Sequence, residues 1–224
     1  MKIVKALIFD FDGLILDTEM PRYTAWKELY LKYHSDLSIF EYALTVGSDD
    51  SKFDFYQNLE DRYQGKINWE IETPERRTRM LSLLEKEKPL PGVKKCIQRG
   101  KDLGLQITLA SSSPRKWVES HLSRHGLIDY FDFITTIEET GKAKPDPALF
   151  NLTLAKLAIL PTEAIVFEDS PNGCIAAKSA GIFCVAVPNN ITKNLEFNNP
   201  ELMIDSMESI LLDQIIATAE KEIA

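Results

Sequence analysis

The sequence predicts an α/β fold, a doubly wound parallel sheet into which a helical segment is inserted after the first strand. Beyond residue 88, short apolar runs alternate with helical patterns, which indicates parallel strands with helices on both faces. Another apolar run stands at the N-terminus, whereas residues 17–87 show helical patterns and no convincing strand. The simplest arrangement places the N-terminal strand in the same sheet. We therefore expect a Rossmann-like core domain of residues 1–16 and 88–224 and a helical cap domain of residues 17–87.

The first predicted strand is a nearly continuous apolar run from Ile3 to Phe9, which ends in Asp10, Asp12 and Gly13. Such a run is typical of a parallel strand that is buried on both faces. Residues two apart in an extended chain point to the same side, so the two carboxylates face the same way. Because like charges at a buried strand end repel unless a cation lies between them, the pair indicates a divalent-metal site. The alternative is an ordinary strand end followed by an Asp-Gly turn.

The inserted segment begins with a helix that Asp17 or Thr18 can cap, and Pro21 fits its first turn. An aromatic and apolar stripe at helical spacing, typical of a helix that faces a core, consists of Trp26, Leu29, Tyr30 and Tyr33. Further helical patterns cover about residues 39–46, 50–63 and 73–86, and the sequence Lys-Pro-Leu-Pro-Gly at residues 88–92 ends the segment.

The rest of the chain alternates between helices and strands. Gly104, Gly126 and Gly181 follow three of the expected helices, where glycine commonly ends a helix. The expected strands cover residues 105–110, 131–135, 164–167, 183–187 and 202–204. The expected helices cover residues 93–103, 114–125, 147–157, 172–180 and the C-terminus.

A hydroxyl-rich stretch, Ser111-Ser112-Ser113-Pro114, follows the second strand of the core. Ser113 is a good N-cap and Pro114 a good first helical residue, so free backbone N–H groups are expected at this edge. They form an anion site, with the serine hydroxyls as extra donors. Arg115 and Lys116 add positive potential there or are simply solvated.

Two further polar stretches are predicted at the same edge, where open α/β sheets bind ligands. Glu168 and Asp169 follow the strand at residues 164–167 and form a second acidic cluster. Lys144 is held in a stiff Lys-Pro segment before a helix. Two acidic strand ends, a hydroxyl-rich helix start and a braced lysine at one edge indicate an active site rather than unrelated caps and turns.

Four stretches carry a family resemblance: Leu-Ile-Phe-Asp10-Phe-Asp12-Gly-Leu-Ile-Leu-Asp17-Thr18-Glu19, Leu-Ala-Ser111-Ser, Lys144-Pro-Asp-Pro and Phe-Glu168-Asp169-Ser-Pro-Asn-Gly. In this order they resemble the four motifs of the haloacid dehalogenase-like superfamily of phosphotransferases, and its β-phosphoglucomutase-like subgroup in particular. The resemblance spans essentially the whole chain, including the helical insertion. The resemblance identifies the superfamily specifically but gives little information about the substrate.

The resemblance implies a Mg²⁺-dependent phosphatase that hydrolyses a small phosphate monoester, such as a sugar phosphate, through an aspartyl-phosphate. It implies that Asp10 is the nucleophile and that Asp12 protonates the leaving oxygen and then activates water. The implied metal ligands are a carboxylate oxygen of Asp10, the backbone carbonyl of Asp12, and Asp169, with Glu168 as a further contributor. The implied phosphate-binding groups are Ser111, the backbone N–H of Ser112, and Lys144.

A phosphohexomutase of the β-phosphoglucomutase type is the runner-up. The mutases that the chain resembles carry a histidine where Arg22 falls. They also have an arginine soon after a cap-loop glycine like Gly47, where this chain reads Ser48-Asp49-Asp50. Both departures favour the phosphatase.

Two other classes fit less well. A dehalogenase works without metal and would have no use for Asp12. A signalling receiver domain needs an acceptor aspartate at the end of a mid-chain strand, and the nearest candidate, Asp54, lies in a helical pattern.

Composition limits the partners. The chain has 224 residues with a net charge of −8, which argues against nucleic acid or an anionic membrane as the main partner. The three cysteines show no metal-type spacing and indicate a reducing compartment, so a cytoplasmic monomer without a signal peptide is expected. The physiological substrate is not predicted. The residues weighed as substrate selectors, each equally readable as an ordinary surface or hinge residue, are Arg22, Tyr23, Gly47, Ser48 and Lys52.

Overall fold

A parallel sheet forms the centre of the computed structural model, which describes residues 4–46, 53–63 and 65–223. Within these residues the strands lie in the order β3-β2-β1-β4-β5-β6, and all neighbouring strands run parallel. Their bounds are β1 Ala6–Phe9, β2 Gln106–Ser111, β3 Phe133–Thr136, β4 Ala164–Glu168, β5 Phe183–Ala186 and β6 Leu202–Met203. The predicted fold class is confirmed.

Helices cover both faces of this sheet. Leu7 and Phe9 of β1 face an apolar cluster with α5, α6 and α10, whereas Ala6 and Ile8 face a second cluster with α8 and α9. This burial on both faces explains why the first strand reads as a continuous apolar run. The helix bounds are α5 Val93–Asp102, α6 Arg115–Arg124, α7 Ile137–Thr140, α8 Ala148–Leu157, α9 Pro171–Ser179 and α10 Leu212–Ile223. Short 3₁₀ turns lie at Ile128–Tyr130, Pro161–Glu163 and Thr192–Asn194.

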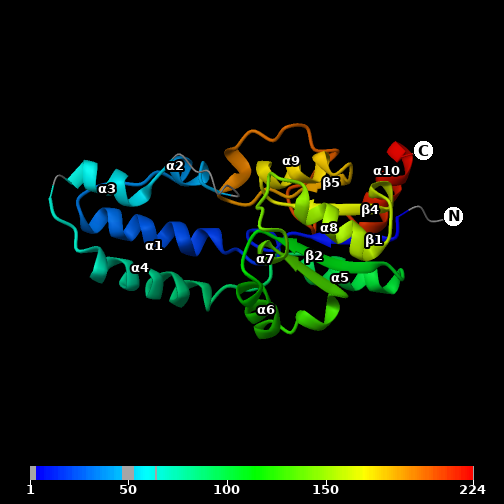
Figure 1. Ribbon diagram of the computed structural model, residues 1–224, viewed down its shortest axis with the longest axis horizontal. Coiled ribbons are helices and arrows are strands. Elements are labelled where there is room, and N and C mark those ends of the chain that lie inside the picture. Colours follow the sequence, from blue (N-terminus) through cyan, green and yellow to red (C-terminus); the bar gives the residue numbers. More distant parts are fainter. Residues whose placement is uncertain (1–3, 47–52, 64, 224) are drawn as a thin grey trace.

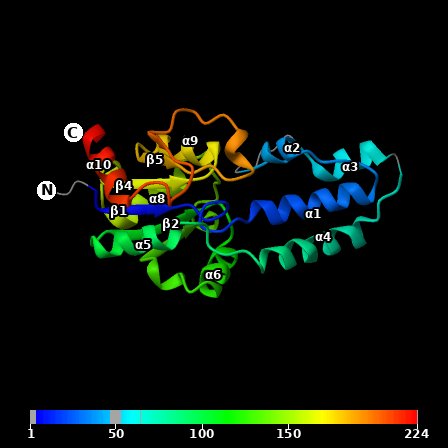
Figure 2. The same ribbon diagram turned by 180° about the vertical axis from the view of Figure 1, so that it is seen from behind.

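The inserted helices lie beyond the carboxyl end of the sheet, on the side opposite the two termini (Figures 1 and 2). They are α1 Glu19–Lys32, α2 Ile39–Ala43, α3 Phe55–Tyr63 and α4 Trp69–Leu84. Helices α1 and α4 run side by side. An aromatic cluster that includes Trp26, Tyr30 and Tyr42 holds the segment together, and Ile191 of the core joins it. This separate cluster supports the predicted domain division at residues 17–87, which stays a prediction.

The two ends of the inserted segment are joined next to the sheet. Leu16 and Pro89 form an isolated antiparallel bridge, and the Leu90 N–H donates to the Ile15 carbonyl oxygen at 2.8 Å. The chain therefore leaves and re-enters the sheet at one point, so the helical segment is attached through a narrow base.

Several predicted helix bounds differ from the observed ones. The helix predicted from residue 73 begins at Trp69 and runs through Pro74, because packing of Trp69 and Glu72 outweighs the one hydrogen bond that proline removes. Helix α2 ends at Ala43 rather than at residue 46. Helix α3 begins at Phe55, and residues 50–52 of its predicted start lie outside the described residues.

Two other expectations concern the cysteines and membrane-spanning helices. Cys96, Cys174 and Cys184 are buried free thiols, which agrees with the predicted absence of a disulfide framework. In the described part of the chain, no helix combines the length and the apolar character needed to cross a bilayer.

Candidate active site

The register of the sheet brings the first acidic pair to its carboxyl edge. Phe9 pairs with Leu109 on one side and with Phe167 on the other, so Asp10 follows at the level of Ala110 and Glu168. The Asp10 N–H donates to the Phe167 carbonyl oxygen at 3.0 Å, which keeps this residue in line with β4.

The chain turns sharply after Asp12. Gly13 adopts a φ of +80°, and its N–H donates to the Leu16 carbonyl oxygen at 2.8 Å. A Cβ at this position would collide with the Asp169 carboxylate. Glycine is therefore required both by the turn and by the close approach of the second acidic cluster.

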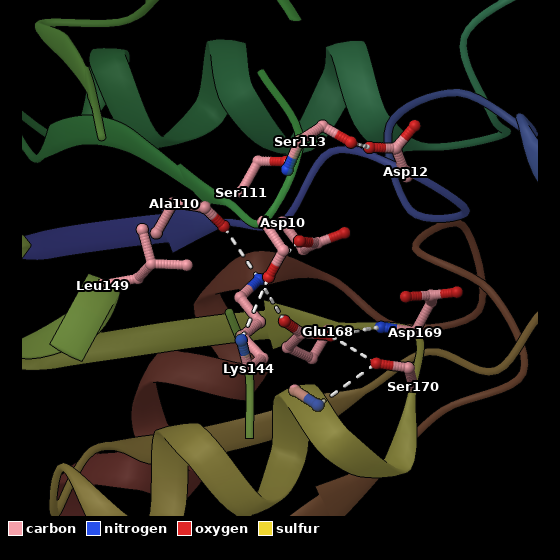
Figure 3. A network of polar contacts seen from close by, with 12 residues as sticks. Asp10, Asp12, Ala110, Ser111, Ser113, Lys144, Leu149, Glu168, Asp169 and Ser170 are labelled. Atoms are coloured by element: carbon pink, nitrogen blue, oxygen red, sulfur yellow. Dashed lines mark hydrogen bonds and ion pairs between the residues drawn. The ribbon is translucent and has the colours of Figure 1, made fainter. Parts of the chain in front are cut away.

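Lys144 lies at the centre of the polar network at this edge (Figure 3). Its side chain is 4% exposed, and its ammonium group donates to one Asp10 carboxylate oxygen, to Glu168 Oε1, and to the Ala110 carbonyl oxygen at 2.8 Å. The three acceptors come from the ends of β1, β2 and β4, so one lysine joins three neighbouring strands.

The second acidic cluster is fixed by the turn into α9. Glu168 Oε2 accepts from the Asp169 N–H at 3.2 Å and from Ser170 Oγ at 3.3 Å. Asp169 Oδ2 accepts from Asn189 Nδ2 at 2.7 Å, and the Asp169 carbonyl oxygen accepts from Thr192 Oγ1 at 2.7 Å. The Glu168 carboxylate is thus oriented by the turn into α9, and the Asp169 carboxylate is oriented by Asn189.

Burial shifts the pKa values in this network. Desolvation raises the pKa of Asp10 well above its usual value, against the lowering effect of Lys144, and the Glu168 charge raises it further. Desolvation also raises the pKa of Asp169, and the charges of Asp10 and Glu168 add to this shift. For Lys144, desolvation lowers the pKa, but the charges of Asp10 and Glu168 outweigh it and the net shift is upward. The lysine therefore stays protonated. A second cation would reduce the repulsion that remains among the carboxylates of Asp10, Glu168 and Asp169.

Asp10, Glu168 and Asp169 form a group that could hold a metal ion. Each offers a carboxylate oxygen, and these oxygens lie within 4.8 Å of one another. Carboxylate oxygens are the donors that hard divalent cations prefer. The chemistry of the donor set therefore fits a divalent cation.

The side chain of Asp12 is not part of this group. Asp12 Oδ2 accepts from Ser113 Oγ at 2.6 Å, and Asp12 Oδ1 accepts from Trp117 Nε1 at 2.9 Å (Figure 3 shows the serine bond). The predicted metal contact of Asp12 uses its backbone carbonyl and stays a prediction. Trp117 is a contact of the site that the sequence did not indicate.

The serine stretch lies at the site, but its predicted helix start is wrong. The N-cap of α6 is Pro114 rather than Ser113, because the Ser113 hydroxyl is used by Asp12. The first helical N–H, of Arg115, donates to the Glu138 carboxylate at 2.9 Å, so this N–H group is not free for an anion. The Arg115 guanidinium bonds Glu119, Glu139 and the Ile134 carbonyl oxygen and adds no free charge to the edge.

Ser111 and Ser112 are nevertheless beside Lys144. Ser111 is buried, and its Oγ accepts from the Ser113 N–H at 3.0 Å. Ser112 Oγ accepts from the Lys144 N–H at 3.1 Å, which ties the lysine loop to the end of β2. The structure thus brings all of the predicted site residues to one edge: Asp10, Asp12, Ser111, Ser112, Lys144, Glu168 and Asp169.

A cavity of about 300 Å³ lies above this edge, between the strand ends and the helical segment. Glu19 and Arg22 of α1, together with Thr45 and Val46, line it opposite the strand ends. Arg22 was predicted only as one of several selectors, and Glu19 only as part of a motif. A larger hollow of about 800 Å³ lies between α5 and α10, away from all of the predicted site residues.

Among the other predicted selectors, Tyr23 packs in the aromatic cluster of the helical segment, and its hydroxyl donates to the Leu37 carbonyl oxygen at 3.1 Å. Its ring is therefore a core side chain rather than a cavity residue. Gly47, Ser48 and Lys52 lie outside the described residues.

Comparisons with known proteins agree with this arrangement. The family described as "Haloacid dehalogenase-like hydrolase" matches residues 7–187. The "Putative phosphatase YhcW" of Bacillus subtilis (strain 168) is 42% identical over 217 residues, covering 95% of this chain and 98% of that protein. Hexitol phosphatase B of Escherichia coli (strain K12) is 32% identical over 196 residues, covering 83% and 84% of the two chains.

A solved structure gives the same result for the fold. The β-phosphoglucomutase (pgmB) of Clostridium difficile superimposes with a TM-score of 0.76 and is 27% identical. The match covers 98% of this chain and 99% of that chain, so it includes the inserted helices as well as the sheet.

Proposed function

Because the chain belongs to the haloacid dehalogenase-like hydrolase family, we propose that it is a Mg²⁺-dependent phosphatase of a small phosphate monoester. In this proposal the substrate is a sugar phosphate or a related metabolite, and the reaction passes through an aspartyl-phosphate at Asp10. The observation that carries the proposal is the convergence of Asp10, Lys144, Glu168 and Asp169 beside one cavity.

Asp10 is the proposed nucleophile. One oxygen of its carboxylate accepts a hydrogen bond from Lys144, which orients the group and leaves the other oxygen for attack on phosphorus. The bond from phosphorus to the leaving oxygen breaks as the bond to Asp10 forms. Water then attacks the aspartyl-phosphate, which releases inorganic phosphate and restores the carboxylate.

Asp12 is the proposed general acid and base. It lines the cavity two residues beyond Asp10, and its carboxylate is oriented by Ser113 and Trp117. Its proton goes to the leaving oxygen in the first step, and it takes a proton from water in the second. Asp12→Asn should therefore impair both half-reactions.

The remaining groups bind charge. Asp10, Glu168, Asp169 and the backbone carbonyl of Asp12 are proposed to hold Mg²⁺, which would neutralise negative charge on the phosphoryl group. Ser111, the Ser112 N–H and Lys144 are proposed to bind the phosphoryl oxygens. Lys144 already bonds three acceptors, so phosphate binding requires that it exchange at least one of them.

The size of the rate acceleration explains why the proposed reaction needs so many groups. Accelerations of phosphate-monoester hydrolysis reach about 10²¹-fold, which is roughly 28 kcal/mol of barrier. A general acid supplies only about 10²–10⁴-fold, and positioning about 7–11 kcal/mol. Formation of the covalent intermediate and fixed positive charge must supply the rest, and the proposed cap would strengthen these charges by displacing bulk water.

Relatives support a sugar-like substrate. The proteins similar to this chain include hexitol phosphatase B and the "Phosphorylated carbohydrates phosphatase" of Thermotoga maritima, which is 30% identical over 180 residues. A cavity of about 300 Å³ also suits a monoester of a few carbons.

A phosphohexomutase is the second candidate, because the chain is similar to β-phosphoglucomutases. Arg22, in place of the histidine that the mutases carry, lines the cavity and argues against it. Incubation with β-glucose 1-phosphate and β-glucose 1,6-bisphosphate separates the two. Net formation of glucose 6-phosphate would support the mutase, whereas release of inorganic phosphate would support the phosphatase.

Three further expectations form part of the proposal. Residues 17–87 act as a cap domain over the site, the protein works as a monomer in the cytoplasm, and its partner is a small phosphorylated metabolite. A screen of phosphate monoesters with Mg²⁺, with and without EDTA, tests the main proposal. The absence of metal-dependent phosphate release from every monoester would contradict it.

A further inference from the structure

The loop that follows β5 reaches the second acidic cluster from the next strand of the sheet. The Val187 N–H donates to the Glu168 carbonyl oxygen at 2.7 Å, which continues the pairing of β4 with β5 by one residue. The loop then brings Asn189 to Asp169 and to the turn at Gly13. Asn189 belongs to none of the four motif stretches. A fourth strand end therefore contributes a side chain to the site, beyond the ends of β1, β2 and β4.

The side-chain amide of Asn189 is fully bonded. Its Nδ2 donates to Asp169 Oδ2 at 2.7 Å and to the Gly13 carbonyl oxygen at 3.2 Å. Its Oδ1 accepts from the Ile191 N–H at 2.8 Å and from the Thr192 N–H at 3.0 Å. An amide offers two donor hydrogens and two acceptor lone pairs, so all four are used. Because two backbone N–H groups face Oδ1, the amide has one orientation, in which its nitrogen faces Asp169.

Gly13, Asp169 and Asn189 are packed closely together. A Cβ at Gly13 would lie 2.2 Å from Asp169 Oδ2 and 2.5 Å from Asn189 Nδ2. Thr192 is fully buried, and its hydroxyl donates to the Asp169 carbonyl oxygen at 2.7 Å and accepts from the Asn189 N–H at 3.0 Å. The loop after β5 therefore holds both the backbone and the carboxylate of Asp169.

A carboxylate that is held in this way suits some divalent cations better than others. Mg²⁺ requires near-octahedral geometry at short distances, whereas Ca²⁺ accepts about six to eight oxygens in flexible arrangements and can take both oxygens of one carboxylate. The bond from Asn189 occupies Oδ2 of Asp169, which favours coordination through the other oxygen alone. The hydrogen bond therefore favours the smaller cation.

We propose that Asn189 is a positioning residue that shifts the metal site toward Mg²⁺ and away from Ca²⁺, because it holds Asp169 in the orientation that suits the smaller ion. The inference rests on the proposed metal-dependent function and adds a residue outside the group of Asp10, Glu168 and Asp169. Asn189 acts through Asp169, as residues that orient metal ligands commonly do, rather than by touching the metal or the substrate.

A matched pair of variants tests the inference without substrate. Asn189→Ala removes the donor to Asp169, whereas Asn190→Ala changes the next residue, an exposed asparagine whose side chain bonds Lys193. The metal-free proteins are unfolded in urea at increasing concentrations of MgCl₂ or CaCl₂, and the gain in stability gives the Kd of each ion. Asn189→Ala should weaken Mg²⁺ binding about tenfold or more and Ca²⁺ binding less than about threefold. Asn190→Ala should leave both Kd values unchanged.

A second variant keeps the bonds within the loop. Asn189→Asp retains an oxygen that accepts from the N–H groups of Ile191 and Thr192, but its carboxylate does not donate to Asp169. The added carboxylate also offers a further oxygen, which Ca²⁺ accommodates more readily than Mg²⁺. The Kd of Ca²⁺ divided by the Kd of Mg²⁺ should therefore fall in this variant too. If Asn189→Ala does not fold, this ratio in Asn189→Asp decides the question.

Turnover of p-nitrophenyl phosphate gives a second readout. Asn189→Ala should need about tenfold more Mg²⁺ for half-maximal turnover, and saturating Mg²⁺ should restore kcat to within about twofold with an unchanged KM.

The outcomes separate the inference from the function on which it rests. Equal losses of Mg²⁺ and Ca²⁺ affinity in Asn189→Ala, as a general loosening of the site would give, or unchanged Kd values would overturn the inference alone. A wild-type protein that neither binds Mg²⁺ nor releases phosphate from any monoester would overturn both.

Discussion

The carboxyl edge of the sheet and the inserted helical segment hold their charges in different ways. At the edge, Lys144 is 4% exposed and joins acceptors from three strands. Between α1 and α4, the Arg79–Glu28 pair has both side chains 45% exposed. A buried charge is costly unless it is paired, whereas an exposed pair contributes little.

This difference indicates which region carries the chemistry. Asp10 and Asp169 are held buried with raised pKa values, an arrangement that weakens the fold unless a cation compensates it. The helical segment instead gains its stability from aromatic packing around Trp26 and Tyr30. Changes at the edge should therefore affect catalysis first, and changes in the helical segment should affect stability or substrate choice.

The largest effect is expected for Asp10→Asn. The variant keeps the shape of the side chain but removes the proposed nucleophile, so kcat should fall by at least about 10⁴-fold. Circular dichroism should show an intact fold, because Lys144 keeps its bonds to Glu168 and the Ala110 carbonyl oxygen. Asp36→Asn, at an exposed site of the helical segment, is the control. Near wild-type turnover in Asp10→Asn would refute the nucleophile assignment.

Chelation of the proposed Mg²⁺ should also abolish turnover. EDTA leaves the carboxylates of Asp10, Glu168 and Asp169 compensated by Lys144 alone, and Mg²⁺ should restore activity. Mg²⁺ at about 100 times its Kd should also raise the free energy of unfolding by about 2.7 kcal/mol. NaCl at equal ionic strength controls for surface ion pairs. Activity that survives EDTA would contradict the metal role.

Two tryptophans compare the regions directly. Trp117 Nε1 donates to Asp12 at 2.9 Å, and Trp69 Nε1 donates to Glu60 at 2.6 Å in the helical segment. Trp117→Phe should lower kcat about tenfold with little change in KM, because Asp12 loses one of its two orienting bonds. Trp69→Phe should leave kcat unchanged. Equal kcat values for the two variants would show that the indole of Trp117 does not position Asp12.

The sequence predicted the groups that stand at strand ends. Asp10, Glu168 and Asp169 each follow a buried apolar run, and the carboxyl ends of parallel strands meet at one edge. The fold class follows from the same alternation of runs. These predictions succeed because each depends on a local pattern and on one general property of parallel sheets.

The partners of these groups were not predictable in the same way. Trp117 is 105 residues from Asp12, and Asn189 is 20 residues from Asp169, in a loop with no regular pattern. Ser113 was expected to cap a helix, but its hydroxyl bonds Asp12 instead. Side-chain contacts of this kind depend on how loops meet in space, for which hydrophobic periodicity carries no signal.

The smallest effect concerns two carboxylates that both link α1 to α4. Glu72 is buried and accepts from Lys32 at 2.7 Å and from the Tyr33 hydroxyl at 2.8 Å, whereas Glu28 pairs with Arg79 at the surface. Desolvation raises the pKa of Glu72, but the bonds from Lys32 and Tyr33 outweigh it and the net shift is downward. Glu72→Gln should lower the free energy of unfolding by about 1 kcal/mol at pH 7, and Glu28→Gln by less than about 0.5 kcal/mol.

The pH dependence of Glu72→Gln gives the sharper test. Because the folded pKa of Glu72 lies below its unfolded value of about 4.3, its contribution is complete above that value. It is lost as the pH falls through the folded pKa. Urea unfolding between pH 7 and about pH 2.5 should therefore show a stability difference between the wild type and Glu72→Gln that is constant above about pH 4.3 and shrinks below it. A stability difference that stays constant down to about pH 2.5, or a Glu28→Gln effect as large, would remove the distinction between the buried and the exposed link.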